Sequence, residues 1–144
     1  MKIGEKLIAK GVIGHEDLER ALEVQRQAGG RLGSILVRMG AVSEDAVLRS
    51  LSEQLGYLCI EPAYMPAPLD IYQCLLSLPV RLEWWLDNDA LLWEVDGQLQ
   101  LVAKDPLETQ LQDLVAYLFT GRPVQYWLAR TQDIDTLVDQ VRRE

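Results

Sequence analysis

The sequence predicts an α+β protein in which a helical N-terminal part is linked to a small α/β sandwich. Three observations support this. Apolar residues as far as Gln54 recur at helical spacing, three X-Pro pairs interrupt residues 61–68, and a later Asp-Gly pair separates two apolar runs as in a β-hairpin. We therefore predict a helical domain over residues 1–61 and an α+β domain over residues 62–144.

The helical part contains an internal repeat with an offset of 29 residues. Self-similarity of this kind indicates two copies of one structural unit, and two copies suit a ligand made of two equivalent halves. The offset relates Lys2-Ile3-Gly4 to Arg31-Leu32-Gly33, Leu7-Ile8 to Leu36-Val37, Gly11 to Gly40, Val12-Ile13 to Ala41-Val42, Leu18 to Val47, Leu22 to Leu51, and Gln25 to Gln54.

Each copy predicts a short helix, a tight break and a longer helix. In the first copy the short helix covers residues 4–10, and Gly11 stands where a helix commonly ends in a left-handed residue. The longer helix follows the i, i+3, i+4, i+7 pattern of one helical face. The residues on that face are Leu18, Ala21, Leu22 and Gln25.

The second copy has equivalent residues at its helix ends. Gly40 is expected to end its short helix, Ser43 to cap the longer one, and Gly56 to end the segment. With Gly29-Gly30 joining the copies, we expect four helices in two related hairpins.

The stretch from Pro62 to Pro68 is expected to be a linker, because its prolines exclude a regular element. Beyond it, Asp96-Gly97 is a typical hairpin turn, and Asp105-Pro106 is typical of a helix start with Asp105 as the N-cap. The expected elements are a helix over 70–78, strands over 90–95 and 98–103, a helix from Asp105 to Gly121, a strand over 123–128, and a helix over 133–143.

Charge is unevenly distributed along the chain. The formal net charge is −8, which argues against general binding of DNA or RNA through their phosphates. Up to Tyr57 the chain has eight Lys or Arg and eight Asp or Glu, so the whole excess of acid lies in the second part. If a small anion binds to this protein, the first part is therefore the more favourable place for it.

Composition indicates a soluble, cytoplasmic protein. The sequence has no run approaching the ~18 apolar residues of a membrane-spanning helix, and its first residues do not resemble a signal peptide. Cys59 and Cys74 lack the spacing of metal ligands and are expected to be reduced thiols.

Catalytic patterns are missing. The sequence contains no phosphate-binding loop of the Gly-x-x-x-x-Gly-Lys type, and His15 is the single histidine, without a nucleophile or paired carboxylate at a recognisable spacing. We therefore expect a protein that is not an enzyme in these residues and that holds neither a metal nor a cofactor.

Binding chemistry is present at the head of each repeat. A basic residue, an aliphatic residue and a glycine at a helix start place a cation beside free backbone N–H groups. The guanidinium of Arg31 matches guanine O6 and N7 and also pairs with phosphate. The same glycines and aliphatic residues would equally serve helix packing, and physical reasoning alone leaves both interpretations open.

With these spacings, the two motifs from Lys2 to Gln25 and from Arg31 to Gln54 closely resemble the MshEN family. This family forms the N-terminal domain of type II secretion and type IV pilus assembly ATPases, and it is also attached to bacterial glycosyltransferases. Residues 102–106 and 121–124 resemble the second subdomain of the same family more loosely.

The resemblance implies binding of cyclic di-GMP, with one motif for each half of the ligand. Arg31 is implied to contact guanine or phosphate, and Asp105 a guanine edge. Lys2 lacks the planar fork of arginine, so its half-site is expected to be the weaker. The implied ligand-binding residues are Lys2, Ile3, Gly4, Leu7, Ile8, Gly11, Leu18, Leu22, Gln25, Arg31, Leu32, Gly33, Leu36, Val37, Gly40, Val47, Leu51, Gln54 and Asp105.

Three functional hypotheses follow. The first is a cyclic di-GMP receptor module that acts on the remainder of a larger host protein. The second is a docking domain of a secretion or pilus ATPase that holds an inner-membrane platform protein and does not bind the nucleotide. The third is the regulatory end of a glycosyltransferase or a similar enzyme whose catalysis lies outside these residues. Under each hypothesis the module is expected in the cytoplasm, either free of the membrane or peripheral or fused to an inner-membrane protein.

Overall fold

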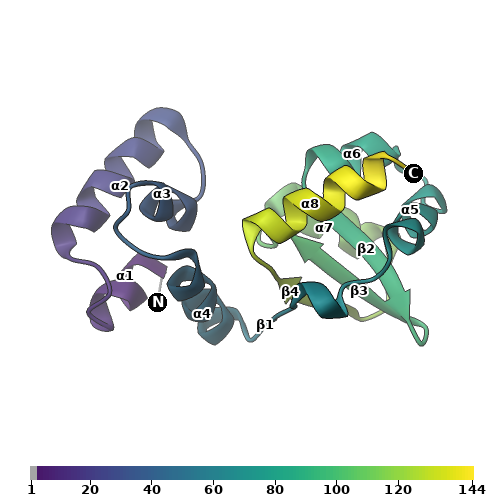
Figure 1. Ribbon diagram of the computed structural model, residues 1–144, viewed down its shortest axis with the longest axis horizontal. Helices are drawn as coiled ribbons and strands as arrows, with labels where there is room; N and C mark the ends of the chain where they lie inside the picture. The colour runs from purple at the N-terminus through teal and green to yellow at the C-terminus, as the bar shows by residue number, and fades with distance from the viewer. Residues whose placement is uncertain (1–2) are drawn as a thin grey trace. The chain divides into compact units, whose positions relative to one another are not determined.

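The computed structural model describes residues 3–144, and of Ile3 only its place in a helix. The chain separates into two compact units, Met1–Tyr57 and Leu58–Glu144. The first is helical, and the second combines helices with a sheet (Figure 1). The predicted α+β class, with a helical part followed by a mixed part, is confirmed.

The described residues of the first unit form the four predicted helices. Helix α3 repeats α1, and α4 repeats α2, at the 29-residue offset found in the sequence. The bounds are α1 Ile3–Ala9, α2 His15–Ala28, α3 Leu32–Arg38 and α4 Glu44–Leu55.

Local residues set the ends of these helices as predicted. Gly11 and Gly40, which follow the two short helices, have φ angles of 71° and 75°, in the left-handed region that favours glycine. Ser43 caps α4, because its hydroxyl oxygen accepts a hydrogen bond from the Ala46 N–H at 3.2 Å. The two copies therefore share their turns as well as their apolar positions.

Helices from both copies enclose one apolar core in the first unit. Helix α1 packs against α3 and α4, and α3 also packs against α2. Neither copy forms a separate core, so the two motifs make one structural body. The buried members are Leu7, Ile13, Ala21, Ile35, Leu36, Val42 and Val47.

The second unit is built on a four-stranded sheet with the order β1-β4-β3-β2. Strands β2 and β3 are antiparallel, while β4 lies parallel to both β3 and β1. The elements are β1 Leu58–Cys59, a 3₁₀ turn η1 Pro62–Tyr64, α5 Pro68–Leu76, α6 Leu82–Asp87, β2 Ala90–Val95, β3 Gln98–Ala103, α7 Thr109–Leu118, β4 Val124–Leu128 and α8 Thr131–Arg142.

The predicted hairpin is confirmed. Strands β2 and β3 occupy the predicted ranges 90–95 and 98–103, with Val95 paired to Gln98 across the turn. Asp96 and Gly97 have φ angles of 51° and 80°. Positive φ at both central residues is what a tight two-residue hairpin needs.

The prediction that Asp105 caps a helix beginning at Pro106 is wrong. Helix α7 begins at Thr109, and its N-cap is Glu108, whose carboxylate accepts a hydrogen bond from the Leu111 N–H at 2.8 Å. Asp105 instead begins a turn, because its carbonyl oxygen accepts from the Glu108 N–H at 3.2 Å. Helix α7 also ends at Leu118, before the predicted end at Gly121.

The division between the units lies between Tyr57 and Leu58, a few residues before the boundary predicted at Pro62. The reason is β1, which the sequence analysis did not anticipate. Leu58 and Cys59 pair with Trp127 and Leu128 of β4, and the Ile60 N–H donates to the Leu128 carbonyl at 2.8 Å. The residues before Pro62 therefore belong to the sheet.

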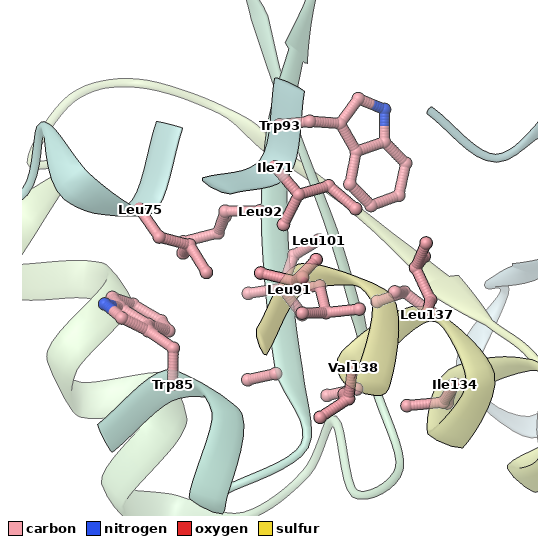
Figure 2. Packing of buried hydrophobic residues seen from close by; sticks show 14 of the residues in the cluster. Ile71, Leu75, Trp85, Leu91, Leu92, Trp93, Leu101, Ile134, Leu137 and Val138 are labelled. Atoms are coloured by element: carbon pink, nitrogen blue, oxygen red, sulfur yellow. The ribbon is translucent and has the colours of Figure 1, made fainter. Parts of the chain in front are cut away.

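Side chains from helices and strands converge in the core of the second unit (Figure 2). Ile71 and Leu75 come from α5, Trp85 from α6, and Ile134 from α8, and each is fully buried. Helix α6 was not predicted from the sequence. The rings of its neighbouring residues Trp84 and Trp85 lie edge to face, with their centroids 5.2 Å apart. All the buried residues of this core lie outside the repeat.

Candidate functional site

The candidate site was predicted mainly within the tandem repeat, and the structure places those residues in the first unit. Lys2 lies outside the described residues, and Ile3 is described only as the first residue of α1. Asp105 belongs to the second unit. The geometry of the site is therefore built from residues 4–54.

Four of the predicted ligand-binding residues are buried in the core of the first unit. Leu7 is 1% exposed, Leu36 is 0% exposed and Val47 is 7% exposed. Gly4 is buried as well. These four residues pack the helices together, and their part in ligand binding stays a prediction.

The glycines Gly4 and Gly33 allow the close approach of two helices in each copy. A β-carbon added to Gly4 would lie 2.6 Å from Leu18 Cδ1, and one added to Gly33 would lie 2.8 Å from Val47 Cγ1. Leu18 and Val47 occupy equivalent repeat positions on α2 and α4. The shared glycine therefore has a structural reason in both copies.

The remaining predicted residues of the repeat reach the surface to different degrees. Leu22 is 37% exposed on α2. This set is the part of the prediction that stays accessible to a ligand. The partly buried members are Ile8, Leu18, Gln25, Arg31, Leu32, Gly33, Val37 and Leu51, and the exposed ones are Gly11, Leu22, Gly40 and Gln54.

Gln25 forms a hydrogen bond to the Gly29-Gly30 segment that joins the two copies. Its Nε2 donates a hydrogen bond to the Gly30 carbonyl at 3.0 Å. Gln54, the equivalent residue on α4, is exposed and makes no such hydrogen bond to a described residue. The two glutamines that close the motifs are therefore not structurally equivalent.

Arg31 stands directly before α3 as its N-cap residue, in an extended conformation. Its carbonyl oxygen accepts from the Ile35 N–H at 3.1 Å, while its half-buried side chain has no hydrogen-bond or ion-pair partner among the described residues. The backbone therefore fixes the position of Arg31 while the guanidinium remains available.

Arg38 is a second available cation, which the sequence analysis missed. A β-carbon placed on Gly30 would lie 4.0 Å from Arg38 Nη2, so this guanidinium extends back to the residue that precedes Arg31. Its spacing could have revealed it. Positions 31 and 38 are two helical turns apart and share one face, whereas the first copy has Ala9 at the equivalent place.

Several other cations of the first unit are engaged by carboxylates. Arg20 binds Asp17 at 2.7 Å, Arg26 binds Glu23, and Lys10 binds Glu53. The pKa values of Asp17 and Glu53 are lowered, chiefly by the hydrogen bonds from Arg20 and Lys10 respectively. In the described part of the unit, Arg38 like Arg31 lacks such a partner.

Asp105 is partly buried in the turn between β3 and α7. Glu108 takes over the capping role, and no described residue hydrogen-bonds or ion-pairs with the Asp105 side chain. The carboxylate of Asp105 therefore forms no hydrogen bond or ion pair that stabilises the described fold.

Residues 3–144 offer neither a metal-binding cluster nor a membrane-spanning helix. No group of three or more His, Cys, Asp or Glu side chains is arranged to hold a metal ion. No helix in the same range is both long enough and apolar enough to cross a membrane.

Comparison with protein families gives a match to the MshEN domain over residues 61–144, which is more than half of the chain. The chain belongs to the MshEN domain family. The match lies in the second unit, whereas the sequence resemblance was strongest over the tandem repeat.

Two curated relatives are similar to this MshEN domain over nearly its whole length, and not over residues 61–144 alone. It is 35% identical over 138 residues to the type IV pilus assembly ATPase PilB of Thermus thermophilus, covering 92% of this chain and 14% of that protein. It is 28% identical over 142 residues to the type II secretion system protein E of Xanthomonas campestris pv. campestris, covering 96% of this chain and 24% of that protein. It thus spans a small part of these relatives.

Solved structures share the fold of this MshEN domain. A structure of MshE with cdg aligns with a TM-score of 0.78 and 22% identity, covering 98% of this chain and 99% of that one. The N-terminal domain of XpsE aligns with a TM-score of 0.72 and 24% identity, covering 96% and 92%. The combination of a helical unit and a mixed α/β unit is therefore common to all three.

Proposed function

We propose that this MshEN domain binds cyclic di-GMP on its helical unit and acts as a non-catalytic regulatory module of a larger pilus or secretion ATPase. The observation that carries the proposal is the pair of guanidinium groups at the junction of the two copies. Arg31 follows Gly30, the guanidinium of Arg38 extends to Gly30, and neither cation has an acidic partner among the described residues.

The ligand's chemistry matches this arrangement. Cyclic di-GMP carries two phosphodiester anions and two guanines, and a guanidinium pairs with a phosphate oxygen or with guanine O6 and N7. Gln25 holds the Gly30 carbonyl, so the backbone between the two copies is fixed beside the cations. The partly exposed aliphatic side chains of Ile8 and Val37 supply apolar surface for a ribose or a purine face.

Two comparisons support the proposal. MshE, whose structure contains cdg, shares this fold over nearly the whole chain. The curated relatives are pilus and secretion ATPases of much greater length, which supports a host protein of that kind. The glycosyltransferase hypothesis gains no support from these relatives and stays a prediction.

Calorimetric titration of the purified chain with cyclic di-GMP tests the proposal. We expect saturable binding by the native protein. Removing one charge-assisted hydrogen bond costs about 1.5–3 kcal/mol, so Arg31→Ala and Arg38→Ala should each weaken binding by roughly 10- to 100-fold.

Arg26→Ala is the matched control, because Arg26 is engaged by Glu23 and should leave binding unchanged. An absence of heat at ~100 μM nucleotide would contradict the proposal and favour the docking hypothesis. Equal binding by the native protein and Arg31→Ala would place the ligand elsewhere. Asp105→Asn tests the second unit, with weaker guanine binding expected if its carboxylate contributes.

A further inference from the structure

A groove of about 560 Å³ in the second unit lies outside the residues proposed for nucleotide binding. Trp93, Gln100 and Trp127 of the sheet line it, together with Glu61 and Tyr64 from the segment that follows β1. Trp93 is only 4% exposed and forms the floor, so the rings of Trp127 and Tyr64 and the carboxylate of Glu61 are the groups that a ligand can reach.

The sheet supplies a rigid wall for this groove. Trp93 and Gln100 are opposite each other in the β2–β3 register, and the Trp127 Nε1–H donates to Gln100 Oε1 at 2.7 Å. Gln100 is 7% exposed, which makes it one of the few buried polar side chains in the described chain. Its hydrogen bond orients the indole of Trp127 at the groove.

The rim carries the exposed groups. Tyr64 is 77% exposed although it is a large aromatic residue. Its N–H donates to the Glu61 carbonyl at 2.9 Å, and Ile60 anchors this turn to the sheet through the Leu128 carbonyl. The carboxylate of Glu61 has no hydrogen-bond or ion-pair partner among the described residues.

Aromatic faces are electron-rich and attract cations, and a nearby carboxylate adds a full negative charge. The second unit holds the whole net charge of −8, so a basic partner is attracted to it at longer range. A guanidinium suits the groove better than an ammonium, because its planar group stacks on indole and pairs with a carboxylate.

We propose that this groove binds an arginine side chain of a partner protein, presented on a segment with apolar neighbours. Val95, which is 50% exposed, lines the groove and provides apolar surface there. Leu58, which is 61% exposed, directly precedes the lining residue Cys59 in sequence. The groove volume exceeds that of one arginine side chain, which leaves room for the flanking residues of the segment. None of these residues is among those proposed to bind the nucleotide.

Nuclear magnetic resonance of the full chain tests this proposal through the indole N–H signals of Trp93 and Trp127. The probe is a capped pentapeptide with a central arginine between two leucines. The matched control peptide has citrulline, which is neutral and of the same shape. We expect saturable shifts of both indole signals with the arginine peptide and at least fivefold weaker binding of the citrulline peptide.

Variants assign the effect to the groove. Glu61→Gln and Tyr64→Ala change exposed residues and should each weaken the arginine peptide at least fivefold, whereas Glu83→Gln on α6 should leave its affinity unchanged. Equal binding of both peptides, or no indole shift at ~5 mM peptide, would overturn the proposal. So would competition between cyclic di-GMP and the peptide for the same indoles.

Discussion

At the residue scale, the glycines of the repeat have two demands placed on them. Lys2 and Arg31 precede Gly4 and Gly33 by two positions, which suits an anion. The close contacts of these two glycines, however, are with Leu18 and Val47 across the helix pair. Because packing explains the glycine without a ligand, the arginine positions are the sharper probes of function.

Gly33→Ala should destabilise the first unit. The added β-carbon would lie 2.8 Å from Val47 Cγ1, and Val47 is a stiff β-branched residue in the core. Overpacking of this kind costs about 1–3 kcal/mol, measured by denaturant unfolding of native and variant chains. Combining it with Val47→Ala should make the two effects less than additive. Unchanged unfolding of the single variant would show that α3 and α4 can move apart without cost.

Ser50→Ala should stabilise the first unit. Ser50 is 1% exposed, and its hydroxyl has no hydrogen-bond partner among the described residues. The first copy has Ala21 at the equivalent position, fully buried. Since a buried unsatisfied hydroxyl costs about 1–3 kcal/mol, we expect a gain on the order of 1 kcal/mol in urea unfolding. A loss of stability would indicate that the hydroxyl finds a partner in solution.

At the element scale, the two copies of the repeat are joined by an ion pair and by helix packing. Lys10, which follows α1, forms an ion pair with Glu53 on α4. Helix α1 also packs against α3 and α4 of the other copy. A truncation that kept one copy would therefore lose the partner helices of its own apolar face.

Glu53→Gln should reduce stability at neutral pH and have no effect in acid. Lys10 lowers the pKa of Glu53 in the folded protein, so the stabilisation is complete above the unfolded pKa. The stabilisation from this ion pair is lost as the pH falls through the lowered pKa that Glu53 has in the folded protein. Unfolding midpoints of the two proteins should therefore converge below pH ~4 and in high salt.

Glu19→Gln on α2 is the control for this experiment, because Glu19 has no described partner. It should track the native protein across the pH range. A difference between Glu53→Gln and the native protein that persisted in strong acid would exclude the ion pair as its cause.

At the scale of the whole molecule, the two units differ in what organises them. The first is organised by helix pairs with equivalent turns, and the second by a sheet whose strands come from distant parts of the chain. Strand β1 begins the second unit and pairs with β4 near its other end.

A fragment of residues 58–144 should be more stable than one of residues 62–144. The shorter fragment lacks β1 and Ile60, which is 7% exposed in the core and bonded through its N–H to Leu128. Burial of one such side chain is worth roughly 1.5–3 kcal/mol, so thermal unfolding should separate the fragments clearly. Equal stability would mean that the sheet does not need β1.

Features that depend on neighbouring residues could be predicted from the sequence. The Ser43 cap, the Gly11 and Gly40 turns and the Asp96-Gly97 hairpin are confirmed, because each depends on the dihedral preferences of adjacent residues. Asp105 failed as a cap because Glu108 supplied a competing carboxylate one turn later. Two acceptable caps close together in sequence cannot be ranked without the position of the helix.

The sequence by itself determined the α+β class, the paired helices and the motif that indicates the family, because periodicity and turn residues are short-range properties. Only the tertiary structure decided that Gly4 and Gly33 serve helix packing, that Arg38 reaches Gly30, and that β1 joins the second unit. These facts depend on which distant residues meet when apolar surfaces are buried together, and no local pattern in the chain specifies that choice.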